Sequence, residues 1–145
     1  MALNVEQLTQ SFDQVRDRGS QFSATFYDTL LSDYPQLQPL FQNTHMMNQG
    51  KKLFESLVLV VDNLHNGDVL TEALSGLGTR HVRYGVLPQH YPMVGSALLK
   101  TFGTLLGSQW TPDVQQAWIE AYQAVSQIML TGADYDSQDL QLSPS

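Results

Sequence analysis

His81 is the residue of this chain best placed to bind a metal, because it interrupts the apolar face of an expected helix. Leu77 and Leu74 precede it by four and seven residues, and Leu70 continues the same stripe. Steps of three and four residues keep side chains on one face of a helix, so the imidazole is expected on the buried face. A neutral imidazole nitrogen there is a metal ligand. The same spacing also fits a histidine that bonds to a backbone carbonyl and has only a structural role.

A second expected helix, upstream of the first, begins its apolar stripe with a polar side chain. The stripe opens at Gln49 and runs through Leu53, Leu57, Val60 and Leu64. If the two helix faces meet, a flat cofactor between them has a nitrogen ligand on one side and a hydrogen-bond donor on the other. Haem fits this arrangement, because the porphyrin supplies four nitrogens and the protein supplies one axial imidazole.

The sequence lacks the residues that most other kinds of functional site require. There is no cysteine, which excludes disulfides, iron–sulfur clusters and thiolate nucleophiles. Neither a Gly-x-Ser-x-Gly nor a His-Glu-x-x-His motif occurs, nor a phosphate-binding glycine loop. The four histidines are not spaced as zinc ligands. The formal net charge of −7, with seven Lys and Arg residues, argues against a nucleic-acid partner and against an anionic membrane surface.

The elements that position these side chains are expected to be helices throughout. No stretch alternates apolar and polar residues as a strand does, so the predicted class is all-α. The helices share no heptad and are joined by corners of different kinds, which favours crossed helices around a pocket over a regular four-helix bundle. Caps and breakers indicate six main helices, over about residues 4–18, 20–33, 49–64, 68–81, 89–106 and 112–131, with a short corner helix over residues 35–41.

Particular residues mark the expected helix ends. Asn4 and Gln7 form a capping box at the first helix, and Gly19-Ser20 ends that helix. Asp68 is the expected N-cap of the helix that carries His81. A threonine cap followed by Pro112 starts the last helix.

The length of 145 residues suits one domain with a single core. We expect this domain over residues 1–131 and a disordered acidic tail over residues 132–145, which is rich in aspartate and ends in Ser-Pro-Ser. The N-terminus has no signal-peptide pattern, and the longest aliphatic run, residues 57–61, is too short for a membrane span. A cytoplasmic protein without membrane association is therefore expected.

The motifs around His81 resemble those of a known family. Residues 4–131 resemble the globins, most closely the single-domain bacterial globins and the globin part of flavohaemoglobins, and also vertebrate neuroglobin. The resemblance implies the globin fold, with six main helices and a short corner helix around a pocket for haem b (iron protoporphyrin IX). It is carried by Leu77-Gly78-x-Arg80-His81-x-x-x-Gly85-Val86, Tyr91-x-x-Val94-Gly95-x-x-Leu98-Leu99 and Trp110-Thr111-Pro112…Ala117-Trp118…Tyr122, and by the joint spacing of Tyr27, Phe41, Gln49, Leu53, His81 and Tyr91.

The resemblance also implies roles for individual residues. His81 matches the proximal histidine that ligates the iron. Tyr27 and Gln49 match the distal residues that point at a bound ligand, and Leu53 matches the aliphatic residue that shapes the ligand cavity. Tyr27, Gln49 and Leu53 thus form the expected catalytic, or ligand-stabilising, set. The expected haem contacts are Phe41, Gln49, Lys52, Leu53, Leu77, Arg80, His81, Leu87 and Tyr91, with Lys52 and Arg80 toward the propionates.

Several of these positions also have a plainer interpretation. Tyr27 fits a half-buried aromatic whose hydroxyl lies in water, and Phe41 fits ordinary core packing. Gln49, Lys52 and Arg80 fit solvated positions on helix surfaces.

The sequence departs from the flavohaemoglobin pattern at several points. Tyr135 aligns where those proteins place a glutamate beside the proximal histidine, and we expect no reductase module after residue 145. The vertebrate distal histidine is absent, while His45 and Lys52 lie near enough in sequence to Gln49 to serve as internal iron ligands. Redox turnover is therefore expected to need an external reductase.

Two functions share the expected pocket. The first is reversible binding of O2 with high affinity, in which Tyr27 and Gln49 donate hydrogen bonds to the ligand. The second is nitric oxide dioxygenation, in which O2 and NO give nitrate with an electron from the external reductase. A gas sensor and a haem-free helical interaction module are further alternatives. The expected partners are O2, NO and CO, and the expected state is a monomer or weak dimer.

Overall fold

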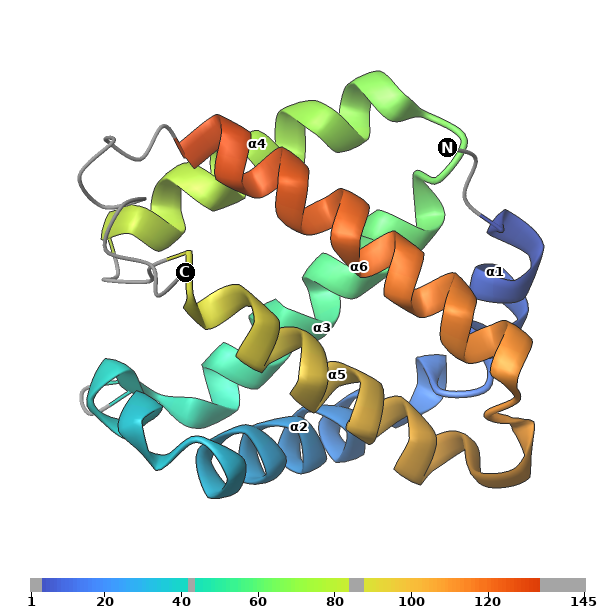
Figure 1. The fold of residues 1–145 in the computed structure, drawn as a ribbon, viewed down its shortest axis with the longest axis horizontal. Helices are drawn as coiled ribbons and strands as arrows, with labels where there is room; N and C mark the ends of the chain where they lie inside the picture. Colours follow the sequence, from blue (N-terminus) through green and yellow to red (C-terminus); the bar gives the residue numbers. More distant parts are fainter. Residues whose placement is uncertain (1–3, 42–43, 84–87, 134–145) are drawn as a thin grey trace.

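The computed structural model describes residues 4–41, 44–83 and 88–133, and throughout these ranges the chain forms helices and short connections. The described residues contain no strand, which confirms the predicted all-α class. They form six α-helices and, at the corner where it was expected, a short 3₁₀ helix, η2 (Figure 1). The elements are α1 (Val5–Asp13), η1 (Arg16–Arg18), α2 (Gly19–Asp33), η2 (Pro35–Phe41), α3 (Met46–Asp62), α4 (Gly67–Arg83), α5 (His90–Leu106), η3 (Gly107–Gln109) and α6 (Pro112–Ala133).

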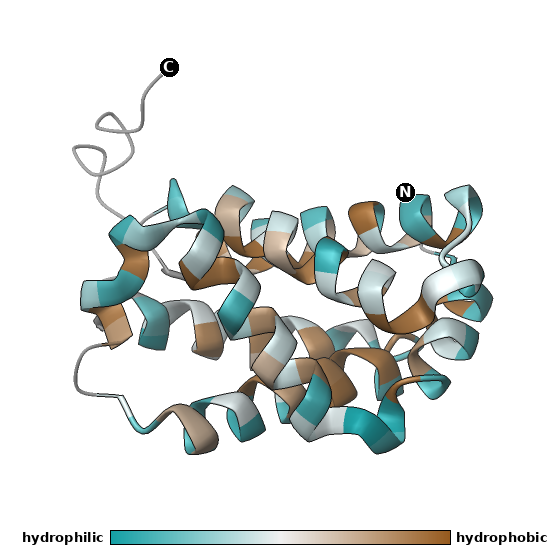
Figure 2. Cartoon of the chain, turned by 90° about the horizontal axis from the view of Figure 1, so that it is seen from below, coloured by the Kyte–Doolittle hydropathy of each residue, from teal (hydrophilic) through white to brown (hydrophobic). Residues whose placement is uncertain are grey.

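The helices pack as crossed pairs rather than as a parallel bundle. The most extensive contact is between α4 and α6, followed by α2 with α5 and α2 with α3, while α1 packs on α6 (Figure 1). Crossed helices are what the differing corners predict. The hydrophobic faces of the helices turn inward and the hydrophilic faces outward (Figure 2).

The main core is built from aromatic side chains of four helices. Phe12, Phe22, Phe102 and Trp118 are each 6% exposed or less. The rings of Phe102 and Trp118 stack with their centroids 4.2 Å apart, and Phe22 meets Phe102 edge-on at 4.9 Å. The Trp118 indole donates a hydrogen bond of 2.8 Å to the Ser11 hydroxyl, so its polar end is satisfied in the core.

A second, smaller cluster lies where α3, α4, α5 and α6 meet. Its buried members are Val60, Leu70, Leu74, Tyr91 and Met129. It joins the C-terminal half of α3 to the N-terminal half of α4. Gln49 and His81 therefore stand at the other ends of these two helices, away from the place where α3 and α4 are tied together.

Two of the expected helix ends differ in the structure. The N-cap of α4 is Asn66, whose side-chain oxygen accepts from Val69 N at 3.4 Å, so the assignment of Asp68 as the cap is wrong. Asp68 lies in the first turn instead, where its charge favours the helix dipole. Gly19 starts α2 rather than ending the first helix, because α1 already ends at Asp13.

Other expected helix ends are confirmed. Asn4 caps α1 by accepting from Gln7 N at 3.2 Å, and Thr111 caps α6 by accepting from Val114 N at 3.2 Å. Gly107 ends α5 with a φ of 55°, a conformation that glycine adopts without a steric penalty. The expected boundary of the domain at residue 131 stays a prediction: α6 continues to Ala133, and residues 134–145 lie outside the described ranges.

Within the described ranges, none of the helices combines the length and the hydropathy that crossing a bilayer requires.

Candidate functional site

Tyr27 and Gln49 meet where α2 crosses α3. The Gln49 side chain lies close enough to the Tyr27 hydroxyl to lower the pKa of that phenol as a hydrogen-bonding neighbour. Tyr27 is only 9% exposed, and its ring meets Phe41 of η2 edge-on with centroids 5.5 Å apart. Tyr27 is therefore buried rather than half-buried, which corrects the plainer interpretation on that point. Three residues that are distant in the sequence form one group, which we call the distal group.

The environment of Tyr27 keeps its hydroxyl protonated. Burial raises the pKa of the phenol, and the hydrogen bond to Gln49 opposes this effect only in part. A neutral phenol retains its hydrogen and can donate it to a ligand. The Gln49 side chain is half-buried and brings an amide with two further donor hydrogens.

His81 donates a hydrogen bond from Nδ1 to the carbonyl oxygen of Leu77, one turn earlier in α4, over 2.8 Å. A carbonyl only accepts, so the proton resides on Nδ1 and the neutral ring keeps its lone pair on Nε2. This is the usual arrangement of a metal-ligating histidine, whose second nitrogen is oriented by a backbone or side-chain acceptor. The backbone bond and a ligand role are thus compatible rather than alternatives.

The charge state of His81 also suits a ligand. Burial lowers the pKa of its imidazole, and the charge of Arg80 lowers it further, while the bond to Leu77 acts in the opposite direction. The ring is therefore neutral at pH 7, the form in which imidazole binds metals.

Apolar side chains between these two polar ends are only half buried. Phe41 of η2, Leu53 and Leu57 of α3, and Leu77 of α4 are all partly exposed, and we call these four residues the half-buried apolar set. Their neighbours on the same stripes are buried, since Val60 is 8% and Leu74 1% exposed. The inner faces of α3 and α4 are thus buried at the second cluster, and they are partly exposed toward Gln49 and His81.

These features fit haem. A flat apolar ring system that covers the half-buried apolar set contributes roughly 25 cal/mol for each Å² of apolar surface removed from water. One neutral imidazole on α4 and one pair of donors on α2 and α3 are the polar groups that an iron porphyrin and its gaseous ligand need.

Tyr91, the residue expected on the proximal side, is 6% exposed and packs in the second cluster with Leu74 and Met129. Its carbonyl oxygen accepts a hydrogen bond of 2.7 Å from the Tyr122 hydroxyl of α6. The Tyr122 ring lies against Gly95, where an added Cβ would stand 2.6 Å from Cε2. The start of α5 is therefore held against α6 by one close contact and one hydrogen bond.

We expect Tyr122 to make the protein alkali-sensitive, because burial raises the pKa of its phenol to about 12. The unfolded chain loses this proton near pH 10, so the stabilisation is complete below pH 10 and is lost as the pH rises toward 12, by about 2–3 kcal/mol. Urea unfolding from pH 9 to 12 measures it. Tyr122→Phe lacks the bond to Tyr91 and should be less stable at pH 9 but more stable at pH 12. Parallel pH profiles for the two proteins would contradict the expectation.

The remaining expected site residues are placed less definitely. Lys52 is exposed on α3 and Arg80 is exposed on α4. Their exposure is compatible both with a contact to a haem propionate and with a solvated side chain. Leu87 and Tyr135 lie outside the described residues. His45, suggested as an internal iron ligand, is exposed and caps α3, with Nδ1 accepting from Asn48 N at 3.3 Å.

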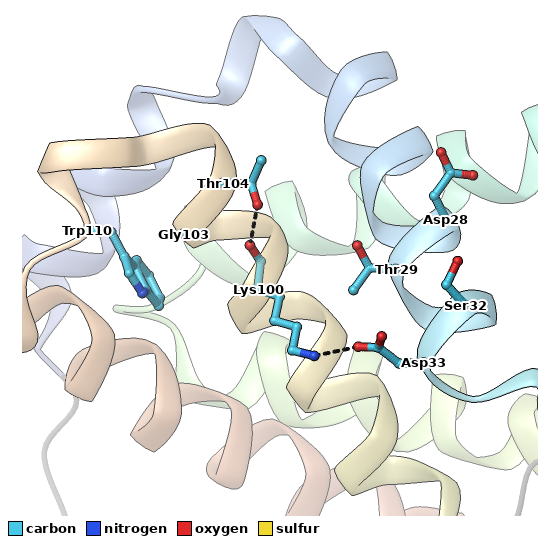
Figure 3. Close-up of a pocket in the computed structure, with 8 residues that line it drawn as sticks. All are labelled: Asp28, Thr29, Ser32, Asp33, Lys100, Gly103, Thr104 and Trp110. Atoms are coloured by element: carbon cyan, nitrogen blue, oxygen red, sulfur yellow. Dashed lines mark hydrogen bonds and ion pairs between the residues drawn. The ribbon is translucent and has the colours of Figure 1, made fainter.

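A separate groove lies between α2 and α5 (Figure 3). It is crossed by the ion pair between Lys100 Nζ and Asp33 Oδ2, 2.5 Å apart, and Trp110 stands beside Gly103 at its edge. It shares no residue with the distal group or with His81. Its lining residues are Asp28, Thr29, Ser32, Asp33, Lys100, Gly103, Thr104 and Trp110.

Sequence reasoning missed three residues that bring the helices of this site together. Ser23 and Gly50 touch where α2 crosses α3, and Gly78 touches the backbone of Met129 where α4 packs on α6. The only signal was a small residue on an otherwise apolar face, a pattern with several common causes.

The crossed helices carry a neutral histidine on α4 and a tyrosine–glutamine pair on α2 and α3, an arrangement that fits a flat prosthetic group. The globin family model matches residues 24–129. The chain belongs to the globin family. The family and its flavohemoprotein members imply haem as the prosthetic group.

Individual relatives agree with this membership. A flavohemoprotein of Burkholderia sp. (strain TH2) is 30% identical over 115 residues, which cover 77% of this chain and 29% of that protein. The chain thus spans less than a third of that relative's length. A bacterial globin from Campylobacter jejuni has a TM-score of 0.78 at 24% identity, covering 89% of this chain and 93% of the other. An engineered carbene transferase from Rhodothermus marinus, provisionally assigned as a nitric oxide dioxygenase, has a TM-score of 0.80 at 27% identity, with 89% of each chain covered.

Proposed function

We propose that this chain binds haem b between α3 and α4 and uses it to bind O2 reversibly with high affinity. The observation that carries the proposal is the pairing of the buried Tyr27 with the half-buried Gln49, which puts two donors beside the half-buried apolar set. A pocket without a polar ligand has no use for a buried phenol beside an amide, since burying polar groups costs free energy unless they gain partners.

The chain's own residues have distinct tasks in this proposal. Haem, when bound, supplies an iron that binds diatomic gases. His81 holds it through Nε2, and the bond from Nδ1 to Leu77 O keeps the imidazole in one tautomer and orientation. The apolar contacts among the described residues are Phe41, Leu53, Leu77 and Tyr91, with Lys52 and Arg80 at the propionates, while the contact proposed for Leu87 lies outside the described residues.

The distal group stabilises the ligand. The Tyr27 hydroxyl and the Gln49 amide donate hydrogen bonds to O2, which attracts donors because it accepts electron density when it binds. Each such bond in a site without water is worth about 1–3 kcal/mol. High affinity then arises through slow dissociation, since donors that are already in place lower the off-rate.

We expect Tyr27→Phe to raise the O2 dissociation rate about tenfold or more, because it removes one donor from the distal group. Stopped-flow displacement of O2 by CO measures the rate. Tyr34→Phe, at the end of the same helix, is the matched control and should leave the rate unchanged. Equal rates in wild type and Tyr27→Phe would show that Tyr27 does not stabilise the ligand.

Nitric oxide dioxygenation is the second candidate, favoured by the similarity to flavohemoproteins and to the Rhodothermus marinus protein. One NO, one O2 and one electron give one nitrate, so this reaction needs an external reductase as partner. Steady consumption of NO with stoichiometric nitrate, in the presence of a reductase and NADH, distinguishes a dioxygenase from a protein that only binds O2.

A further inference from the structure

The crossing of α2 and α3 is unusually close at one point. Ser23 of α2 is 7% exposed, and its hydroxyl donates a hydrogen bond of 2.7 Å to the carbonyl oxygen of Gly50 in α3. This bond runs between helices, whereas the hydroxyls of Ser11 and Ser56 bond to carbonyl oxygens of their own helices. It ties one backbone position of α3 to one side chain of α2.

Gly50 makes this approach sterically allowed. A Cβ added at Gly50 would lie 2.8 Å from Ser23 Cβ and 3.3 Å from Ser23 Oγ. Two carbon atoms that are not bonded do not approach to 2.8 Å, so any side chain at position 50 must push α3 away from α2. The obstacle is a single carbon atom, Ser23 Cβ, which is fixed to the backbone and has no rotamer that removes it.

The same crossing carries both donors of the distal group. Tyr27 is one helical turn after Ser23 and therefore on the same face of α2. Gln49 directly precedes Gly50 in α3. The Tyr27 hydroxyl and the Gln49 side chain are thus neighbours across the two helices, within one turn of the Ser23–Gly50 contact. A shift of α3 by a few tenths of an ångström changes the distance between these two donors directly.

We propose that Ser23 and Gly50 are positioning residues that set the separation of the two donors and thereby the affinity for the ligand. Neither residue touches the ligand, and both act through Tyr27 and Gln49. The effect on affinity rests on the proposed function, whereas the effect on the distance between Tyr27 and Gln49 does not.

The test adds a Cβ to position 50 of α3 and, in a second variant, also removes the Cβ of position 23 from α2. Gly50→Ala alone should force the helices apart and raise the O2 dissociation rate about tenfold. Ser23→Gly combined with Gly50→Ala removes the obstructing carbon and should return the rate close to that of Ser23→Ala. Ser23→Ala keeps the spacing, loses only the interhelical bond and should raise the rate about threefold or less.

Two further readouts report the donors themselves. The C–O stretching frequency of the CO-bound protein falls when a donor approaches the ligand, so Gly50→Ala should shift it upward and the double variant should restore it. The NMR signal of the Gln49 side-chain amide in the full-length chain, identified by its loss in Gln49→Leu, should move in Gly50→Ala toward its position in Tyr27→Phe. This signal reports the proximity of Tyr27 whether or not the chain holds haem.

Gly103→Ala is the matched control. It also adds a methyl group at a close helix contact, 3.2 Å from Trp110 Cδ1, but on α5 and in the groove of Figure 3. Urea unfolding should show a loss of stability in this variant too, while the O2 dissociation rate and the Gln49 signal stay at their wild-type values.

Each outcome has a separate meaning. If Gly50→Ala leaves the Gln49 signal and the O2 rate unchanged while Tyr27→Phe changes both, the positioning role is wrong and the proposed function stands. If Tyr27→Phe does not change the O2 rate, or the chain takes up no haem, the proposed function is wrong and the Gln49 signal alone decides the positioning role. If Gly50→Ala does not fold, the folded double variant supports the role, and an unfolded double variant overturns it.

Discussion

His81→Gly is expected to abolish the Soret band of the purified protein, and added imidazole is expected to restore it. The variant removes the one neutral imidazole that α4 presents and leaves a space of the same shape, which free imidazole can fill. The bond from His81 Nδ1 to Leu77 O orients the native ring, and free imidazole has the same acceptor available. Absorption spectra of the ferric, reduced and CO-bound forms measure the effect.

His65→Gly is the control for this experiment. His65 is exposed in the turn before α4, and it undergoes the same change of side chain. Its spectra should match those of the wild type. A Soret band that persists unchanged in His81→Gly without imidazole would show that another residue ligates the iron.

Gly78→Ala is expected to destabilise the protein by about 2–3 kcal/mol. A Cβ at this position would stand 2.1 Å from the carbonyl oxygen of Met129. The obstacle is backbone of α6, so no side-chain rotation relieves it, and α4 must move away from its most extensive partner. Because Gly78 lies one turn before His81, the shift also moves the imidazole. Urea unfolding of the purified chain measures the loss.

Gly76→Ala is a control in the same helix. Its added Cβ would meet only the tip of the Arg80 side chain, at 3.5 Å, which is an ordinary contact. Replacing glycine by alanine inside a helix then stabilises by about 0.5–1 kcal/mol. The two variants, two positions apart, should therefore change stability in opposite directions. Equal stabilities would mean that α4 and α6 are not in close contact at Gly78.

Short-range patterns in the sequence are enough to predict the helices and most of their ends. Each apolar stripe depends only on the spacing of residues within one helix, and the sequence gives this spacing directly. This holds for the stripe through Leu70, Leu74 and Leu77 and for the stripe that begins at Gln49 and Leu53. The caps at Asn4 and Thr111 depend on a bond over three residues and are equally local. The cap of α4 was misassigned because Asn66 and Asp68 both suit the position and only the backbone geometry separates them.

The parts that could not be predicted depend on contacts between helices. Ser23 and Gly50 look like ordinary helix residues until the crossing of α2 and α3 brings them together. Gly78 looks like a weak point of α4 by helix propensity, and only the position of Met129 explains it. The half burial of Leu53 and Leu77 is likewise a property of the assembled helices, since their apolar character alone predicts full burial.

If the half-buried apolar set is covered by haem as proposed, we expect the lifetime of this protein in the cell to depend on the supply of haem. A ligand that binds only the folded chain adds about 4 kcal/mol to its stability when its free concentration is a thousand times its dissociation constant. Chains made while haem is scarce lack that increment and leave Leu53, Leu57 and Leu77 partly open to water. They unfold more often, and quality-control proteases remove unfolded chains. On the proposed function, we expect the abundance of the protein to follow the availability of haem.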